Sequence, residues 1–138
     1  SADAMIRRVP FMALQKAIYS LLSKGQTTPV YDDVPENAIL PYITLGEFTC
    51  KLDADKTNTI WNTSISIHGW SDYAGKKEIN TILDDVATVL SSVSPDLSES
   101  NFGVIDSDID FLEAFPEEST GYHGVITVRF KIQDKGSR

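Results

Sequence analysis

The segment INTILDDVATVL (residues 79–90) decides the fold, because it has the clearest periodicity in the chain. Its apolar residues recur at steps of three and four, which places them on one face of an α-helix. Ser71 or Asp72 can cap the start of this helix, and Pro95 lies just beyond its end. The apolar face consists of Ile79, Ile82, Leu83, Val86, Val89 and Leu90. The segment therefore predicts an amphipathic helix that packs against an apolar layer.

Segments with the two-residue period of half-buried strands flank this helix. Upstream, Trp61, Ile65 and Ile67 alternate with polar residues. Downstream, we expect a strand in which Ile105, Ile109 and Phe111 point one way. The last strand spans residues 122–132, with Tyr122, Ile126, Val128, Phe130 and Ile132 on one face and His123, Arg129 and Lys131 on the other.

The first half of the chain supplies the remaining elements. Apolar residues between Phe11 and Leu22 predict a helix that Gly25 ends. Residues 30–35 form a short extended piece, residues 41–50 a strand, and residues 52–59 a polar hairpin connection. The order is α-β-β-β-α-β-β. It predicts an α+β fold, a mainly antiparallel sheet of four to five strands with two amphipathic helices on one face.

The length of 138 residues suits one hydrophobic core. We expect a single α+β domain over residues 9–133. Residues 1–8 are expected to be a disordered segment, in which residues 1–4 are a possible cloning scar, and residues 134–138 a flexible C-terminus.

Composition excludes several classes of protein. The net charge of −8 and the isoelectric point of about 4.6 argue against a surface that binds nucleic acid or an anionic membrane. Cys50 is the only cysteine, so no internal disulfide is possible, which favours a reducing compartment. No apolar run approaches the roughly 18 residues of a membrane span, and a cytosolic origin is expected.

The segment from Gly69 to Lys77 approaches a phosphate-binding loop, because a strand precedes it and a helix follows. Its spacer is one residue too long, however, and the bulky side chains of Trp70 and Tyr73 occupy it. Lys77 stands where a hydroxyl residue is required. An ordinary strand-to-helix connection is the better interpretation, and we predict no cofactor.

Asp106, Asp108, Asp110 and Glu117 have the spacing of a calcium-binding loop. Phe111 replaces the glycine that such a loop needs, and the preceding helix is missing. A strand with a solvated acidic face fits the pattern better.

His68 and His123 are the only histidines, and each precedes a glycine on a different predicted strand. They can approach each other, but two imidazoles without a third ligand make a poor zinc site. We interpret both as outward-facing or turn-adjacent residues. Cys50 has no evident base partner, so no catalytic residue and no metal ligand is predicted.

Four segments in order resemble a known family. They are residues 30–35 (VYDDVP), residues 41–47 (PYITLGE), residues 67–71 (IHGWS) with Gly75 and the helix from Lys77, and residues 123–126 (HGVI) with Phe130 and Lys131. Together they resemble the tail-completion, or tail-to-head joining, proteins of long-tailed bacteriophages and prophages. The resemblance extends from about Phe11 to Ile132, and its markers are structural.

The resemblance implies a non-enzymatic structural protein at the head-proximal end of the tail tube. Its implied partners are the tail tube protein, the head connector or head-completion protein, and further copies of itself. These copies would form a ring, a hexamer in the virion, although the free chain can be a monomer. DNA would pass through the ring without specific binding. The implied location is the virion, after assembly in the host cytoplasm.

Ring contacts join two different patches of each subunit. Residues 52–59 and 113–121 are our candidates, since both are polar, long and poor in core residues. The predicted contact residues are Asp53, Asp55, Lys56, Thr57, Asn58, Glu113, Glu117 and Glu118. Both segments can equally be mobile surface loops.

A different class of function remains open, a small cytosolic ligand-binding or enzymatic domain. It requires a concave pocket with convergent polar groups. An acidic mimic of DNA is a third alternative, which requires carboxylates along one face.

Overall fold

The structure is a computed structural model that describes residues 7–55, 57–118 and 121–136. Its elements are α1 (Phe11–Gly25), β1 (Val30–Tyr31), β2 (Tyr42–Leu52), β3 (Ile60–Ser71), α2 (Lys77–Ser92), the 3-10 turn η1 (Ser98–Ser100), β4 (Phe102–Glu117) and β5 (Gly121–Asp134). This order confirms the α-β-β-β-α-β-β pattern and the α+β class.

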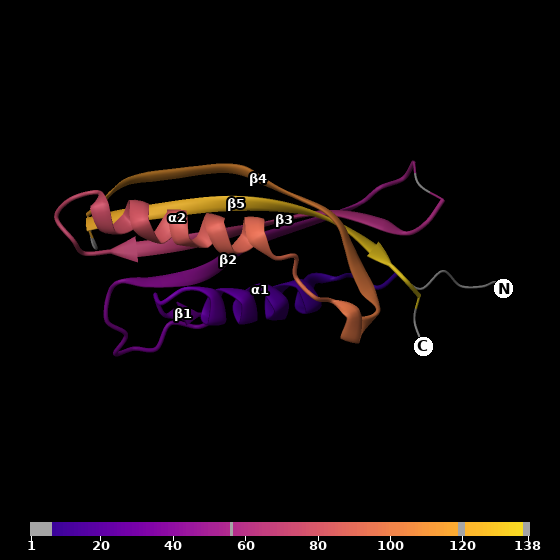
Figure 1. The fold of residues 1–138 in the computed structure, drawn as a ribbon, viewed down its shortest axis with the longest axis horizontal. Coiled ribbons are helices and arrows are strands. Elements are labelled where there is room, and N and C mark those ends of the chain that lie inside the picture. The colour runs from indigo at the N-terminus through magenta and orange to yellow at the C-terminus, as the bar shows by residue number, and fades with distance from the viewer. Residues whose placement is uncertain (1–6, 56, 119–120, 137–138) are drawn as a thin grey trace.

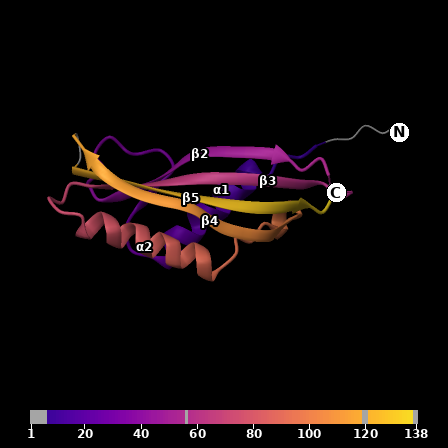
Figure 2. The same cartoon turned by 90° about the horizontal axis from the view of Figure 1, so that it is seen from above.

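One five-stranded sheet forms the body of the protein, with the strand order β1-β2-β3-β5-β4 (Figure 1). The short β1 pairs in parallel with β2, and the other neighbours are antiparallel. Both helices pack on one face of this sheet, and Figure 2 shows the long strands running side by side along the molecule. The opposite face, called the open face below, carries neither of the two described α-helices.

The core lies between the helices and the sheet. From α1 it receives Leu14, Ile18 and Leu22, all fully buried. From α2 it receives Ile79, Ile82, Leu83, Val86 and Leu90, five of the six residues in the predicted stripe. Each such side chain contributes roughly 1.5–3 kcal/mol through burial. Val89 is half-buried and lies where α1 ends, because a Cβ built on Gly25 would come within 2.9 Å of its Cγ2 atom.

The start of α2 differs from the sequence prediction. Neither Ser71 nor Asp72 caps the helix, which begins after Lys76 without a side-chain cap. Ser71 is instead the last residue of β3, and its hydroxyl donates to Glu78 (2.7 Å) and accepts from the N–H of Tyr73 (3.1 Å). The prediction was wrong because β3 continues to Ser71, which leaves a five-residue turn before the helix.

Strand β4 is longer than the predicted segment and contains two bulges. They fall between Val104 and Asp106 and between Ile109 and Phe111. Each bulge adds a residue and resets the alternation of side chains. Ile109 therefore packs against the core, whereas Ile105 and Phe111 are 53% and 49% exposed. The expectation that these three residues share one face was wrong.

Arg8 fastens the start of the chain to its end. Its guanidinium donates to the Ser100 carbonyl (2.7 Å) and the Asp134 carboxylate (2.6 Å), and it lies 4.2 Å from the centre of the Phe102 ring. Residues 1–6 and 137–138, parts of the termini predicted to be disordered or flexible, lie outside the described residues. Within the described part of the chain, no helix is long and apolar enough to cross a membrane.

Candidate interaction surfaces

The predicted contact residues of the first loop lie in the turn between β2 and β3. The N–H of Asp55 donates to the carboxylate of Asp53 (3.2 Å), and Thr57 and Asn58 are exposed. Lys56 lies outside the described residues. The hairpin connection predicted for residues 52–59 is confirmed, with β2 ending at Leu52 and β3 beginning at Ile60.

The second predicted contact segment is mostly strand. Residues 113–117 continue β4, so the expectation of a long polar loop from Glu113 was wrong. The ladder to β5 continues beyond the second bulge to the last pair, Glu117 opposite Gly121. Glu113 and Glu118 are exposed, whereas Glu117 is half-buried.

The two contact segments lie at opposite ends of the sheet. Ser71, at the end of β3, pairs with Tyr122 beside the β4–β5 turn. Ile60, at the other end of β3, follows the β2–β3 turn and pairs with Gln133. Figure 1 shows the β2–β3 turn and the paired ends of β4 and β5 toward opposite ends of the long axis.

The acidic residues of β4 do not converge on one point. Asp106 and Asp108 stand opposite Lys131 and Arg129 of β5, and Asp110 lies 3.4 Å from Arg129. Among the described residues, no group of three or more acidic, histidine or cysteine side chains is arranged to hold a metal ion. The carboxylates instead line the sheet edge formed by β4, as a solvated acidic strip.

Two marker glycines form a cross-strand pair beneath α2. Gly69 of β3 stands directly opposite Gly124 of β5. A Cβ on Gly69 would lie 3.1 Å from Ile79 and Ile82, and one on Gly124 would lie 2.9 Å from Leu83. Helix α2 thus rests directly on the backbone of the two central strands, which explains why side chains are missing there.

The histidines that precede these glycines meet on the open face. The Nδ1 atom of His68 lies 2.7 Å from the Nε2 atom of His123. The other nitrogen of His68 lies 2.8 Å from a carboxylate oxygen of Glu47, and that of His123 lies 3.3 Å from one of Glu117. We call these four residues the His–His chain. It takes one residue from each of β2, β3, β5 and β4.

Local backbone features and aromatic rings position the His–His chain. A bulge in β2 after Leu45 places Glu47 beside His68, and a Cβ on Gly46 would lie only 2.5 Å from the His68 ring. His123 is 9% exposed because Trp70 stacks on its ring at 3.8 Å and Phe115 packs edge-on at 4.9 Å. The sequence prediction of approach was right, but the interpretation of both histidines as outward-facing missed the burial of His123.

The His–His chain shifts the pKa values of two of its members. Burial and the positive charge of His68 lower the pKa of His123, although the Glu117 carboxylate opposes the effect. The hydrogen bond from His68 lowers the pKa of Glu47. The sequence did not reveal the His–His chain, because the register of the strands must be known before the contact can be recognised. The repeated His-Gly dipeptide was the only available signal.

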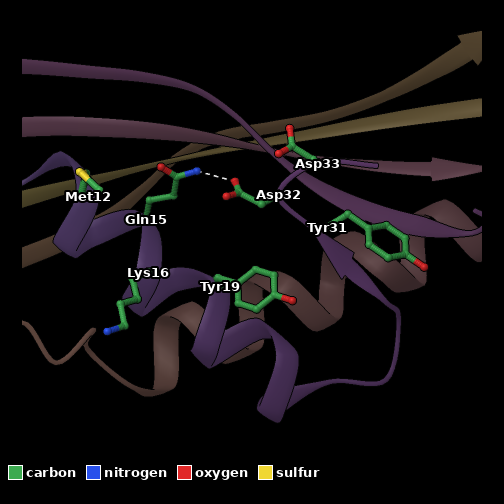
Figure 3. A pocket seen from close by; sticks show the side chains of 7 residues that line it. All are labelled: Met12, Gln15, Lys16, Tyr19, Tyr31, Asp32 and Asp33. Carbon is green, nitrogen blue, oxygen red and sulfur yellow. Dashed lines mark hydrogen bonds between the residues drawn. The ribbon is translucent and has the colours of Figure 1, made fainter. Parts of the chain in front are cut away.

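A shallow cavity of about 450 Å³ lies between α1 and the segment after β1. Figure 3 shows that it is lined by Met12, Gln15, Lys16 and Tyr19 from α1 and by Tyr31, Asp32 and Asp33 from the other side. Its central contact is the hydrogen bond from Gln15 to Asp32, which attaches the first marker segment to α1. Gln15 and Asp32 bind each other, and the other polar groups that line the cavity do not converge on a common point (Figure 3).

The comparisons with known proteins agree with the sequence resemblance. The family model described as tail completion protein gp17 matches residues 14–133. A solved chain described as "Virion of native gene transfer agent (GTA) particle" shares the fold, with a TM-score of 0.51 and 16% identity over 91% of this chain and 92% of that one. No curated protein sequence matches the chain. Because the family model covers most of its length, this chain belongs to the tail completion protein gp17 family and is a structural component of a phage-type virion.

Proposed function

We propose that the protein completes the head-proximal end of a phage tail tube and joins the tail to the head connector, without enzymatic activity. The observation that carries this proposal is the family match over residues 14–133. The likeness to a chain of a gene transfer agent virion supports it, because that chain with the same fold is part of a virion.

The placement of the contact segments fits a part that bridges two neighbours. The β2–β3 turn carries Asp53, Asp55 and Asn58 at one end of the sheet, and Glu113 and Glu118 lie toward the other. One end can therefore contact the tail tube protein while the opposite end contacts the head connector or head-completion protein.

We further propose that the copies form a ring, a hexamer in the virion, through contacts between different edges of neighbouring sheets. The two sheet edges differ as such contacts require. The β4 edge exposes Phe111 and Leu112 beside its acidic strip, whereas an apolar groove lined by Val9, Phe11 and Phe48 lies beside β2. Residues 9–133 would act as one domain in this ring.

The acidic charge supports a passage for DNA that does not hold it. A net charge of −8 argues against a surface that binds many phosphates. An acidic wall repels the backbone of the passing duplex, so transport is not slowed by binding.

A paired set of variants tests the bridging role in assembling phage. The first variant lacks residues 53–58, and the second carries Glu113→Lys and Glu118→Lys at the opposite end. We expect each to leave tails and heads intact but unjoined, with the purified chain still folded. Since the ends contact different partners, one variant should keep the protein on tails and the other should release it. Normal joining by both variants would exclude these segments as contacts.

A matched control uses an exposed residue outside both segments. Met12, on α1, is 78% exposed, and Met12→Ala should assemble normally. Electron microscopy counts joined particles, and antibody labelling locates the protein on free tails.

A further inference from the structure

The His–His chain connects all four long strands at the end of the sheet that carries the β4–β5 turn. Glu47 belongs to β2, His68 to β3, His123 to β5 and Glu117 to β4. These four residues contact one another, and His123 also contacts the flanking rings of Trp70 and Phe115. If this part of the open face served only for packing, apolar side chains would be sufficient, as they are on the opposite face of the same strands.

Counting protons shows how much positive charge the chain can hold. Only one proton fits between the two nitrogens that lie 2.7 Å apart, so one of them must be an acceptor. The two outer nitrogens each face a carboxylate, and both can donate. The full set of contacts therefore needs three N–H groups on two imidazoles, which amounts to one neutral ring and one cationic ring.

A fourth proton is incompatible with this geometry. Two N–H groups would then point at each other across 2.7 Å, and two positive charges would face each other beside the half-buried ring of Trp70. The charged groups that face the pair are Glu47 from β2 and Glu117 from β4. Glu113 lies on the same face of β4, two residues before Phe115, which pairs with His123. Only two carboxylates thus lie close enough to offset the second charge.

We propose that the His–His chain is a proton-operated latch, closed with one shared positive charge and opened by a second proton. In the closed state it holds β2, β3, β5 and β4 together on the open face. In the open state the His68–His123 hydrogen bond breaks, and the end of the sheet around Phe115 and His123 loosens.

The direction of the pH effect follows from the lowered pKa of His123. The unfolded chain binds this proton more tightly than the folded chain does. The stability that the second proton removes is therefore fully present above the ordinary histidine value of about 6.5. It is lost as the pH falls from that value through the lower value of the folded protein.

The composition allows an experiment to attribute a pH effect near neutrality to the latch. His68 and His123 are the only histidines in the chain. Of the ordinary side chains, only histidine titrates between pH 5 and 7, so a change in this range belongs to the pair.

Amide hydrogen exchange on the purified chain, followed by NMR at pH 7.0 and 5.0, tests the latch. After correction for intrinsic exchange chemistry, residues 113–117 and 121–125 should open about fivefold more often at the lower pH, the effect of losing one hydrogen bond. Residues 102–104 and 130–133, at the other end of the same strand pair, should change much less. Equal change at both ends would overturn the proposal.

Two variants separate the latch from general acid sensitivity. The variant His68→Gln/His123→Gln has no imidazole, and its exchange pattern should not depend on pH in this range. Gly46→Ala keeps both histidines but displaces the His68 ring, because its Cβ would occupy space 2.5 Å from that ring. Imidazole titration by NMR should then show His123 moving back toward the ordinary histidine pKa. If either variant fails to fold, the titration of the native chain still decides, because two independent imidazole titrations without mutual influence would exclude the latch.

Discussion

Substituting alanine for Gly124 should destabilise the protein through direct overpacking beneath α2. The new Cβ would lie 2.9 Å from Cδ1 of Leu83 and 3.0 Å from Cγ1 of Ile79. Carbon atoms in contact prefer about 3.5–4.0 Å, so the side chains of Leu83 and Ile79, or α2 itself, must shift by about half an ångström or more. Overpacking of this kind costs about 1–3 kcal/mol. The gain from restricting the unfolded chain is only about 0.4–1 kcal/mol.

The net expectation for Gly124→Ala is a loss of about 1–2 kcal/mol in the free energy of unfolding. Urea denaturation followed by circular dichroism measures it. The matched control is Gly75→Ala, whose Cβ would meet the Tyr73 ring at an ordinary 3.4 Å and which should be neutral within about 0.5 kcal/mol. Leu83→Ala should make room for the new methyl group of Gly124→Ala. The double variant should therefore lose about 1 kcal/mol less in the free energy of unfolding than the losses of the two single variants added together. A Gly124→Ala protein as stable as the native chain would refute this account of the glycine pair.

Three further predictions concern the ends of the chain and α1. Arg8→Ala should lower the free energy of unfolding, measured by urea denaturation, by about 1–3 kcal/mol. The reason is that the Asp134 carboxylate, only 10% exposed, loses its cation. A change below about 0.3 kcal/mol would show that this contact does not stabilise the fold. Burial raises the pKa of Asp134, but hydrogen bonds from Arg8 and from a backbone N–H outweigh it and lower the pKa below its ordinary 3.8. Stability from this group is thus present above pH 3.8 and lost on further acidification, and Asp134→Asn should flatten the decline in stability below pH 4. Leu14→Ala should lower the free energy of unfolding by about 2–5 kcal/mol. Met12→Ala, two residues away but exposed, should change it by less than about 0.5 kcal/mol. Similar losses for the two variants in thermal unfolding would contradict the assignment of the buried face of α1.

The sequence predicted those parts of the fold that depend on a regular period. The stripe in α2 is buried as expected, and β5 buries Ile126, Val128, Phe130 and Ile132 on one face. Helical and strand periods are local properties, so neighbouring residues are sufficient to detect them. The antiparallel pairs β2–β3 and β4–β5 followed because a turn joins the two strands of each pair.

Departures from the period escaped the sequence analysis. Strand β4 has bulges near Ile105 and Asp110, and each reverses the side of all residues that follow. An alternating pattern with an extra residue resembles a short strand followed by a loop. The segment from Glu113 was therefore predicted to be a loop, although it continues the ladder to Glu117.

The candidate surfaces were predicted unevenly for a similar reason. The β2–β3 turn could be placed because polar, turn-forming residues interrupt two strands. The His–His chain could not be placed from the sequence. His68 pairs with Val125 across the strands, whereas His123 pairs with Trp70, so the two histidines meet only on a diagonal. Such a contact depends on the register of strands 55 residues apart in the sequence, and nothing local specifies it.

The glycines of the marker segments connect the two faces of the sheet. Gly69 and Gly124 admit α2 on one face, and the histidines before them, His68 and His123, meet on the other. The family markers are thus explained by packing and hydrogen bonding without invoking catalysis.

The central claim is that the protein joins completed tails to heads. Its most direct test is electron microscopy of particles made with and without the gene, in the phage or phage-like element that encodes it. We predict DNA-filled heads and separate tails in its absence, with joined virions restored by the native protein and by the Gly75→Ala control. Normal numbers of joined, infectious particles without the protein would contradict the claim.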